Sequence, residues 1–585
     1  MTDGSIESES TARGQGAAGS PRATGATRAT LLLALLWPAV SPVAQAGDER
    51  FDLVIVHGRI IDGTGSPWYS GDLGIRDGRI AAIGNLEKTA RARTIDAHGE
   101  VVAPGFIDML GQSELSILVE PRVPSKIFQG ITTEITGEGN SVAPLNDFII
   151  QSDRKVYEHY GVTPDWRTLR QYFARIEKQG IGINFATYIG ATSVRRMVLG
   201  DEDRQPTPEQ LDEMKRLVQE GMRAGAVGLS SALEYAPAPY AKTEELIALA
   251  GEAAKFGGIY ATHLRSEGDG IMAALDEAIR IGRSAGIPVE VWHLKVAGRR
   301  NFGLMPAVVA KIDAARATGT DVSANTYAYT AWENGLSAFI PPWAHDGGNA
   351  KLAARLHDPA LRKRIREEIL RPSTEWDNEW DEIPGPEAVM VGVVHKAGLL
   401  PLQGKTLAEV ASKWKKDPID TLFDLLIEDD ALTEVAVFGM SEADVALALE
   451  QPWVSVDNDS SGTSPEGILG KEHPHPRAYG TFPRVLRKYV REEHKLTLED
   501  AVRKFTALPA QRMRLTDRGV LKRGVWADLV IFDPTTVRDT ATYESPNSLS
   551  QGMEYVLVNG VPVIDHGQMT GALPGKVLRG AGYEP

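Results

Sequence analysis

Two histidines in this sequence stand where a metal site could form. His263 follows the short apolar run 259–262, and His293 follows a second such run, 288–292. Between them, residues 271–281 place apolar side chains at helical spacing, so the segment predicts a strand, a helix and a strand. Such a unit lays its strands parallel, and both imidazoles then project from one strand end, the active face of α/β barrels. The alternative is a pair of ordinary structural histidines.

Carboxylates follow two further apolar runs. The run 453–459, WVSVDND, ends in Asp459, and two imidazoles, a carboxylate and a water make a reasonable hydrolytic zinc site. Asp457 and Asn458 are the other candidates for this role. Asp457 projects to the same side of a strand as Asp459, so the alternation of side chains does not choose between the two aspartates. A turn-forming Asp-Asn-Asp-Ser-Ser-Gly sequence is the structural alternative.

Glu138 lies in a Gly-Glu-Gly turn after the run 131–136. The chain has no cysteine, so disulfides and thiolate ligands are excluded. Any metal must therefore be held by histidine, aspartate, glutamate, carbonyl groups or a modified lysine. Glu138 is the best additional anionic ligand at the same rim, and a solvated turn glutamate is the alternative.

These residues need a scaffold that brings several strand ends together. Strands and helices alternate through the middle of the chain, which predicts a closed (β/α)₈ barrel at residues 105–515. The predicted strands lie near 101–109, 131–138, 183–190, 226–232, 258–263, 287–293, 321–329 and 453–459. The predicted helices include 208–224, 243–256, 271–285 and 305–318. The rhythm breaks at about 331–452, which predicts an inserted subdomain before strand eight.

The two ends of the mature chain share another pattern. Residues 47–104 and 516–585 are short alternating strands separated by Gly and Asp-Gly turns. Two β-rich ends around an α/β middle predict one small β-sandwich built from both. The fold class is thus α/β, a TIM-like barrel with a terminal β-sandwich.

The first 46 residues predict a signal peptide. A small polar region precedes the apolar run 29–40, and Val43-Ala44-Gln45-Ala46 contains an A-x-A cleavage pattern. The apolar run is too short to span a bilayer. We expect an exported, periplasmic or secreted protein that starts near Gly47. A disordered tail on a cytoplasmic protein is the alternative.

Charge narrows the class of partner. The net charge is −15 over 585 residues, without long acidic runs. This balance argues against nucleic acid or an anionic membrane surface as the main partner. We expect a small-molecule substrate and no membrane contact after signal removal; the oligomeric state does not follow from the sequence.

Several motifs together resemble a known family. They are VxxGRIIDGTG (56–65), VVAPGFID (101–108), QGITTEITG (129–137), YATHLRSEGD (260–269), HLKVAGRRNFG (293–303), PHPRAYGTFPRVLRKYV (474–490), RGVLKRGVWADLVIFDP (518–534) and VLVNG (556–560). Residues 51–579 resemble the D-aminoacylase (N-acyl-D-amino-acid deacylase) branch of the metal-dependent amidohydrolases. That branch has a barrel, a terminal β-sandwich and a late insertion.

The resemblance implies roles for individual residues. His263 and His293 match the metal-binding histidines of strands five and six, and Asp459 matches the catalytic aspartate of strand eight. Arg477 matches an arginine that holds the substrate carboxylate, a task suited to a bidentate guanidinium. Two further positions match a tyrosine near the scissile carbonyl and a lysine beside the second histidine: Tyr329 and Lys295.

The chain also departs from the family. The superfamily follows GFID with x-His-x-His, but here Leu110 and Gln112 stand at the histidine positions. The family's cysteine ligand on strand two is absent, and Glu138 is the candidate replacement. A serine after the family's Tyr-x-Tyr is replaced near Glu333. The strand-one metal site is therefore expected to be lost, and the site on strands two, five and six to persist.

The sequence thus predicts a hydrolase of C–N amide bonds. One divalent ion, Zn²⁺ or another divalent metal, would be bound by Glu138, His263 and His293. Asp459 would transfer protons, and Tyr329 would help to stabilise the oxyanion. The substrate would carry a carboxylate that binds Arg477. Lys295 would be a second residue that contacts the substrate.

Alternatives remain at this stage. One is a related dipeptidase, lactonase or cyclic amidase. Another is a non-catalytic exported binding protein on a decayed barrel, which the loss of the strand-one histidines favours. His473 and His475 lie close to Arg477 and could line the pocket, although surface positions fit their Pro-rich loop better.

Overall fold

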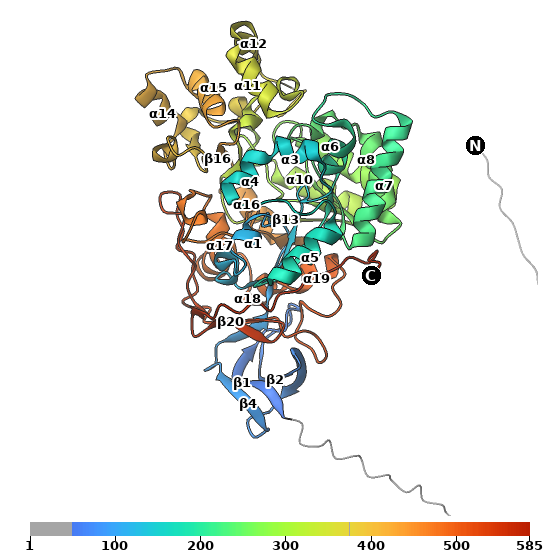
Figure 1. The fold of residues 1–585 in the computed structure, drawn as a ribbon. Helices are drawn as coiled ribbons and strands as arrows, with labels where there is room; N and C mark the ends of the chain where they lie inside the picture. The colour runs from blue at the N-terminus through green and yellow to red at the C-terminus, as the bar shows by residue number, and fades with distance from the viewer. Residues whose placement is uncertain (1–49, 374) are drawn as a thin grey trace, which may run out of the picture. The chain divides into compact units, whose positions relative to one another are not determined.

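The structure, a computed structural model, describes residues 50–373 and 375–585 (Figure 1). The predicted signal peptide, residues 1–46, lies outside the described residues. Among the residues described, no helix is both long enough and apolar enough to cross a membrane.

A barrel of parallel strands forms the centre of the described chain. Its strands are β6 (Phe106–Asp108), β7 (Ile131–Thr136), β8 (Asn184–Thr187) with β9 (Ile189–Gly190), β10 (Gly228–Ala232), β11 (Ile259–His263), β12 (Val289–Val291), β13 (Val322–Thr326) and β17 (Val454–Val456). Parallel pairing runs through β6-β7-β8 and through β9-β10-β11-β12-β13-β17. β8 and β9 are consecutive pieces of one barrel strand, and a parallel bridge between Gly111 and Ser460 joins the first strand to the last. The predicted (β/α)₈ barrel is confirmed.

Helices lie between the barrel strands where the hydrophobic spacing predicts them. They include α7 (Pro208–Ala224), α8 (Thr243–Ala254), α9 (Ile271–Ala285) and α10 (Met305–Ala317). In α7, the side chain of Thr207 accepts a hydrogen bond from the backbone of Gln210 in a capping box, and Gly225 ends the helix with a positive φ. Neighbouring helices such as α7 and α8 pack together outside the barrel (Figure 1).

The predicted first barrel strand, 101–109, is two strands. β5 (Val101–Pro104) pairs with β1 (Phe51–Ile60) and β18 (Leu529–Phe532), whereas β6 pairs with β7. Gly105 separates them, and a Cβ at this position would lie within 3 Å of the Thr132 side chain. The prediction was wrong because one apolar run contributes strands to two different sheets. Gly105 lies between these strands, where the backbone closely approaches Thr132.

The terminal β-structure uses both ends of the described chain, as predicted. Its hydrogen-bonded path is β21-β20-β19-β18-β5-β1-β2-β3, with β4 (Arg91–Asp96) added beside β1. The remaining strands are β2 (Tyr69–Arg76), β3 (Arg79–Gly84), β19 (Met553–Val558), β20 (Val561–Asp565) and β21 (Gln568–Met569). Alternating buried residues of these strands, among them Leu53, Ile55 and Leu529, form one apolar core. Figure 1 shows β1 and β20, from opposite ends of the chain, in this region.

The predicted insertion before strand eight is present. It contains a three-stranded sheet in the order β14-β16-β15, made of β14 (Trp332–Gly335), β16 (Glu434–Val437) and β15 (Val389–Val391). Its helices include α11 (Asn349–His357), α12 (Pro359–Ile369), α13 (Glu379–Glu382), α14 (Leu407–Trp414) and α15 (Pro418–Glu428). Residues of β14 and α13 face the cavity described next.

Candidate metal centre and active site

A cavity of about 430 Å³ opens at the carboxyl ends of the barrel strands. Barrel strands and the loops that follow them supply Gln112, Glu138, Glu234, His263, Glu267, His293, Lys295 and Asp459 to its lining, and α17 (Arg477–Arg484) supplies Arg477. Glu138 follows β7, His263 is the last residue of β11, and His293 follows β12. Parallel strands therefore bring residues 155 positions apart into contact.

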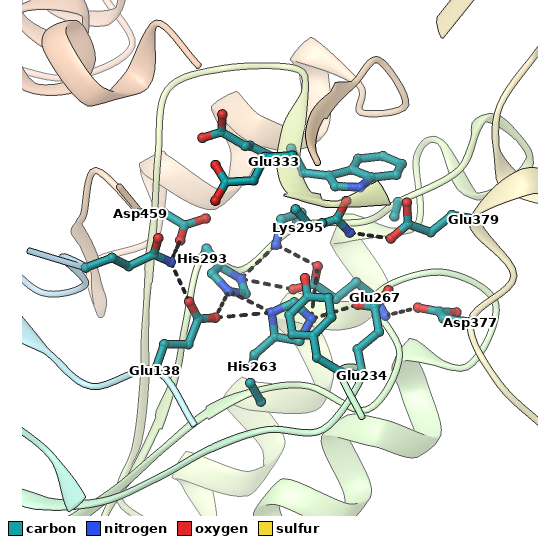
Figure 2. Close-up of a pocket in the computed structure, with 18 of the residues that line it drawn as sticks. Glu138, Glu234, His263, Glu267, His293, Lys295, Glu333, Asp377, Glu379 and Asp459 are labelled. Atoms are coloured by element: carbon teal, nitrogen blue, oxygen red, sulfur yellow. Dashed lines mark hydrogen bonds and ion pairs between the residues drawn. The ribbon is translucent and has the colours of Figure 1, made fainter. Parts of the chain in front are cut away.

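Glu138, His263 and His293 converge on one point (Figure 2). Oε1 of Glu138 lies 2.9 Å from Nε2 of His293 and 3.3 Å from Nδ1 of His263. The two ring nitrogens themselves are 2.9 Å apart. The predicted ligand set thus offers one carboxylate oxygen and two imidazole nitrogens within reach of a single ion.

Two glutamates hold the outer nitrogens of these imidazoles. Oε2 of Glu234 lies 2.8 Å from Nε2 of His263. Oε1 of Glu267 lies 3.0 Å from Nδ1 of His293, and Lys295 Nζ lies 2.7 Å from the same nitrogen while donating to Oε2 of Glu267 at 2.6 Å. When each outer nitrogen donates to a carboxylate, the inner nitrogen keeps the lone pair that a metal requires.

The electrostatics of this cluster favour a cation between the histidines. Burial raises the pKa of Glu138, but hydrogen bonds with His263 and His293 outweigh burial and hold it well below its usual range. Burial lowers the pKa of His263, but the surrounding glutamates, Glu267 first, raise it well above its ordinary value. The carboxylates therefore attract positive charge to this point.

The donor set fits zinc. Tetrahedral ligands at the usual zinc distances lie about 3.4 Å from one another, so the three measured separations need to widen by at most about 0.5 Å. One carboxylate with two neutral imidazoles leaves a position for water or substrate, as in hydrolytic zinc sites. A second possible set, Glu234, His263 and Glu267, shares His263 with the first. Because Glu234 and Glu267 hold outer imidazole nitrogens, we interpret them as supports of the first set.

Two site residues have unusual backbone conformations. His293 has φ +34° and Asp459 has φ +44°, both in the left-handed region. Such conformations cost of order 1–3 kcal/mol in non-glycine residues and concentrate at functional sites. The backbone N–H of His293 donates to Asn325 Oδ1 at 2.7 Å, which secures the turn.

Asp459 lines the cavity, and its rival Asp457 does not. Oδ2 of Asp459 lies 2.9 Å from Nη1 of Arg477, and Oδ1 accepts a hydrogen bond from Gln112 Nε2 at 3.2 Å. Asp457 is fully buried and its pKa is raised well above its usual range by burial and by the neighbouring Asp459. The geometry favours Asp459 as the carboxylate that meets substrate.

Gln112 links the metal candidate to this aspartate. Its Nε2 also donates to Oε2 of Glu138 at 2.7 Å. Leu110, at the other lost histidine position, is fully buried in an apolar cluster with Ile107 and Tyr188. The segment after strand one therefore contributes an amide donor at Gln112 and an apolar side chain at Leu110.

Tyr329 does not line the cavity, contrary to its predicted position near the scissile carbonyl. Its ring lies against His475 and Arg484, and its hydroxyl donates to the Pro476 carbonyl at 3.4 Å. The loop after β13 carries it away from the pocket, whereas the ring of Tyr327 faces Arg477, with 4.8 Å between the ring centroid and Cζ. The structure does not bring Tyr329 to the reacting groups.

Glu333 and the two loop histidines have defined places. Glu333 lines the cavity, and its Oε2 lies 3.8 Å from Nη2 of Arg477. His475 is buried at 1% exposure, and His473 contacts the Tyr543 carbonyl at 2.7 Å. Neither histidine lines the cavity, and His475 is not the surface residue expected from its loop.

The sequence analysis missed the supporting groups. Glu234 and Glu267 lie two and four residues past strand ends, so the sequence could have predicted their position at the rim of the barrel. It could not have predicted which imidazole each glutamate contacts. It also missed Lys126, whose Nζ contacts Asp108 at 2.7 Å, Glu134 at 3.0 Å and Asn458 at 2.6 Å inside the barrel. No local pattern marks this lysine as buried.

Known proteins resemble this chain closely. The model of the "Amidohydrolase family" matches residues 394–564. The N-acyl-D-glutamate deacylase of Alcaligenes xylosoxydans xylosoxydans is 36% identical over 91% of this chain and 97% of its own length. The D-aminoacylase of the same organism is 36% identical over 92% of this chain and 99% of its own.

A solved structure agrees with these relatives. The N-acyl-D-glutamate deacylase of Bordetella bronchiseptica, complexed with zinc and a phosphonate that mimics the tetrahedral intermediate, is 34% identical. It covers 91% of this chain and 100% of its own, with a TM-score of 0.75. The likeness therefore extends over the barrel, the insertion and the terminal β-structure.

Proposed function

This chain belongs to the D-aminoacylase family of metal-dependent amidohydrolases, and we propose that it hydrolyses N-acyl-D-amino acids with one zinc ion held by Glu138, His263 and His293. It is a hydrolase of carbon–nitrogen bonds other than peptide bonds. The observation that carries the proposal is the convergence of this ligand set with Asp459 and Arg477 in one cavity.

A zinc ion on these side chains would supply a Lewis acid for the amide carbonyl and for a water molecule. The side chains around this site first orient the two imidazoles. Glu234 contacts Nε2 of His263 and Glu267 contacts Nδ1 of His293, and these carboxylates favour the tautomers whose inner nitrogens present a lone pair. Lys295 lies beside this cluster at 4% exposure and lines the cavity, where its ammonium could contact substrate.

Asp459 is the proposed proton carrier. Because Arg477 holds Oδ2, the proton is accepted at Oδ1, the oxygen beside Gln112 Nε2. The same atom can then deliver the proton to the leaving nitrogen, the usual sequence for a positioned carboxylate. Arg477 binds the substrate carboxylate and so fixes the amide relative to Asp459.

The test is metal loading and activity measured together. The mature chain would be supplied with zinc, analysed for metal content and assayed with N-acetyl amino acids of both hands. We expect about one zinc per chain, hydrolysis of the D-isomers, and joint loss of metal and activity in His263→Ala. The matched control is His98→Ala, an exposed histidine of the terminal β-region. An active His263→Ala enzyme that retains its metal would overturn the site.

We also propose that the protein is exported. The apolar run 29–40 and the A-x-A sequence ending at Ala46 support cleavage near Gly47. Terminal sequencing of the protein from cell fractions tests this. A cytoplasmic protein that retains residues 1–46 would refute it.

A further inference from the structure

An acidic wall forms one side of the cavity, and the mechanism above does not use it. Asp377, Glu379 and Glu382 come from the Trp-rich segment EWDNEWDE, residues 375–382 of the insertion, and all three line the cavity. Glu379 is 2% exposed and Glu382 is 4% exposed. We call these three residues the acidic wall.

No basic side chain neutralises the acidic wall. Within the ranges that the structure describes, no lysine or arginine lies within ion-pair distance of its carboxylates, whereas neighbouring Asp381 pairs with Arg300 outside the cavity. Lys295, the one lysine among the described residues of the cavity lining, is held by Glu267. Burial of carboxylates without counter-charge is costly, and a bound cation would offset that cost.

Glu379 also has an unused acceptor. One of its oxygens accepts from Asn334 Nδ2, whereas Oε2 is buried without a donor, and the carboxyl group also contacts the carboxyl group of Glu234. Burial and the nearby Glu234 raise the pKa of Glu379 well above its usual range, and burial raises that of Asp377 to about 6. Both shifts are those expected of carboxylates that lack a positive partner.

The wall lies across the cavity from the carboxylate-binding end. Figure 2 shows Asp377 and Glu379 on the opposite side of the histidine pair from Asp459, the partner of Arg477. A substrate whose carboxylate meets Arg477 and whose amide lies at the histidines would therefore extend toward the acidic wall. The indole of Trp332 lines the same cavity and offers an aromatic surface to a cation.

We propose that the acidic wall binds a cationic group of the substrate, an ammonium or a guanidinium, so that the preferred substrates carry positive charge at one end and a carboxylate at the other. This rests on the proposed deacylase function. The cation could belong to the acyl group or to the side chain of the amino acid. In either case a positively charged group would contact the carboxylate of Glu379.

Paired substrates test the proposal with the zinc-loaded mature chain. N-acetyl-D-lysine is compared with N-acetyl-D-norleucine for the side-chain source, and N-(5-aminopentanoyl)-D-methionine with N-pentanoyl-D-methionine for the acyl source. We expect kcat/KM to favour the cationic member of at least one pair by about tenfold or more, the effect of one charge-assisted contact. The pair that shows the preference identifies the source.

Variants separate recognition from general damage. Glu379→Gln keeps the contact with Asn334 but removes charge, so kcat/KM should fall about tenfold for the cationic substrate and stay unchanged for its neutral partner. Glu375→Gln, an exposed residue of the same segment, should change neither.

Three outcomes would overturn the proposal. The first is hydrolysis of the neutral substrates with no cationic preference in either pair, which leaves the deacylase function standing. The second is an equal loss on both members of a pair in Glu379→Gln. The third is a second metal ion per chain that Glu379→Gln removes, since the wall would then be a metal site. Failure to hydrolyse any N-acyl amino acid would instead refute the deacylase function and this proposal with it.

Discussion

Nη1 of Arg477 lies 2.9 Å from Oδ2 of Asp459, and their side chains are 2% and 7% exposed. The proposed carboxylate anchor and the proposed proton carrier are therefore one buried ion pair. A substrate carboxylate on Arg477 would offset part of the charge that stabilises the Asp459 anion. Substrate binding and the basicity of Asp459 are coupled by this contact.

Arg477→Gln should impair substrates that carry a carboxylate. The lost charge-assisted contact corresponds to a fall in kcat/KM of about 100-fold. N-acetyl-D-methionine amide has no carboxylate and should be affected much less. Steady-state kinetics on this amide and on N-acetyl-D-methionine check the prediction, and a melting curve checks folding. An equal loss on both substrates would contradict carboxylate binding.

The acid limb of the activity profile should move in the same variant. Burial raises the pKa of Asp459, and the Arg477 guanidinium opposes that rise. Proton acceptance needs the carboxylate, so activity falls as pH decreases through this raised pKa. Removing the guanidinium removes a lowering influence, and the acid limb of Arg477→Gln should shift to higher pH.

A pH profile of kcat/KM with the amide substrate measures this shift. Arg484→Gln is the matched control, because Arg484 lies on the same helix but pairs with Asp539 outside the cavity. A limb that stays in place, or moves to lower pH, would show that Asp459 does not set it.

Much of the fold could be predicted because its signals are local. Helices α7 and α9 have the bounds that the sequence predicts, 208–224 and 271–285. The division of 101–109 into β5 and β6 could not be predicted, because it depends on the approach of Gly105 to Thr132 from another strand. The alternation of apolar and polar residues predicts that a segment is extended. It does not show that the two halves of an apolar segment pair with different sheets.

The candidate site was predictable to a similar degree. Strand-end positions identified Glu138, His263 and His293 as neighbours, because parallel barrel strands end at one rim. Tyr329 was misplaced because its position depends on the path of an irregular loop after β13. Side-chain direction in loops depends on packing partners from distant segments, here His475 and Arg484.

Lys126→Met should destabilise the barrel. The Lys126 ammonium is completely buried between Asp108 and Glu134, and its loss leaves buried carboxylates without their counter-charge. Breaking a buried pair in this way costs about 3–5 kcal/mol in the free energy of unfolding. Urea denaturation measures the change.

Lys155→Met is the comparison for this lysine. Lys155 pairs with Asp430 at the surface, where an ion pair contributes about 0–1 kcal/mol. A Lys126→Met protein as stable as the Lys155→Met protein would mean that the buried carboxylates become protonated at little cost.

Glu234→Gln should weaken metal binding although Glu234 is not a proposed ligand. Its carboxylate accepts from Nε2 of His263, which leaves Nδ1 free to face Glu138. A glutamine can accept through its carbonyl or donate through its amide, so it fixes the imidazole less firmly and without charge. Loss of such a partner lowers metal affinity by about 10–100-fold. Competition with a chromophoric chelator measures the zinc dissociation constant.

Comparing the zinc affinity of Glu234→Gln with that of Glu138→Gln distinguishes a residue that supports a ligand from a residue that binds the metal itself. Glu138→Gln removes a proposed ligand and should reduce zinc content itself, whereas Glu234→Gln should still bind one ion at high zinc concentration. Glu244→Gln, an exposed glutamate paired with Arg280, should leave affinity unchanged. If Glu234→Gln loses zinc as completely as Glu138→Gln, the metal lies between Glu234, His263 and Glu267. In that case the second cluster is the metal centre and Glu138 supports it.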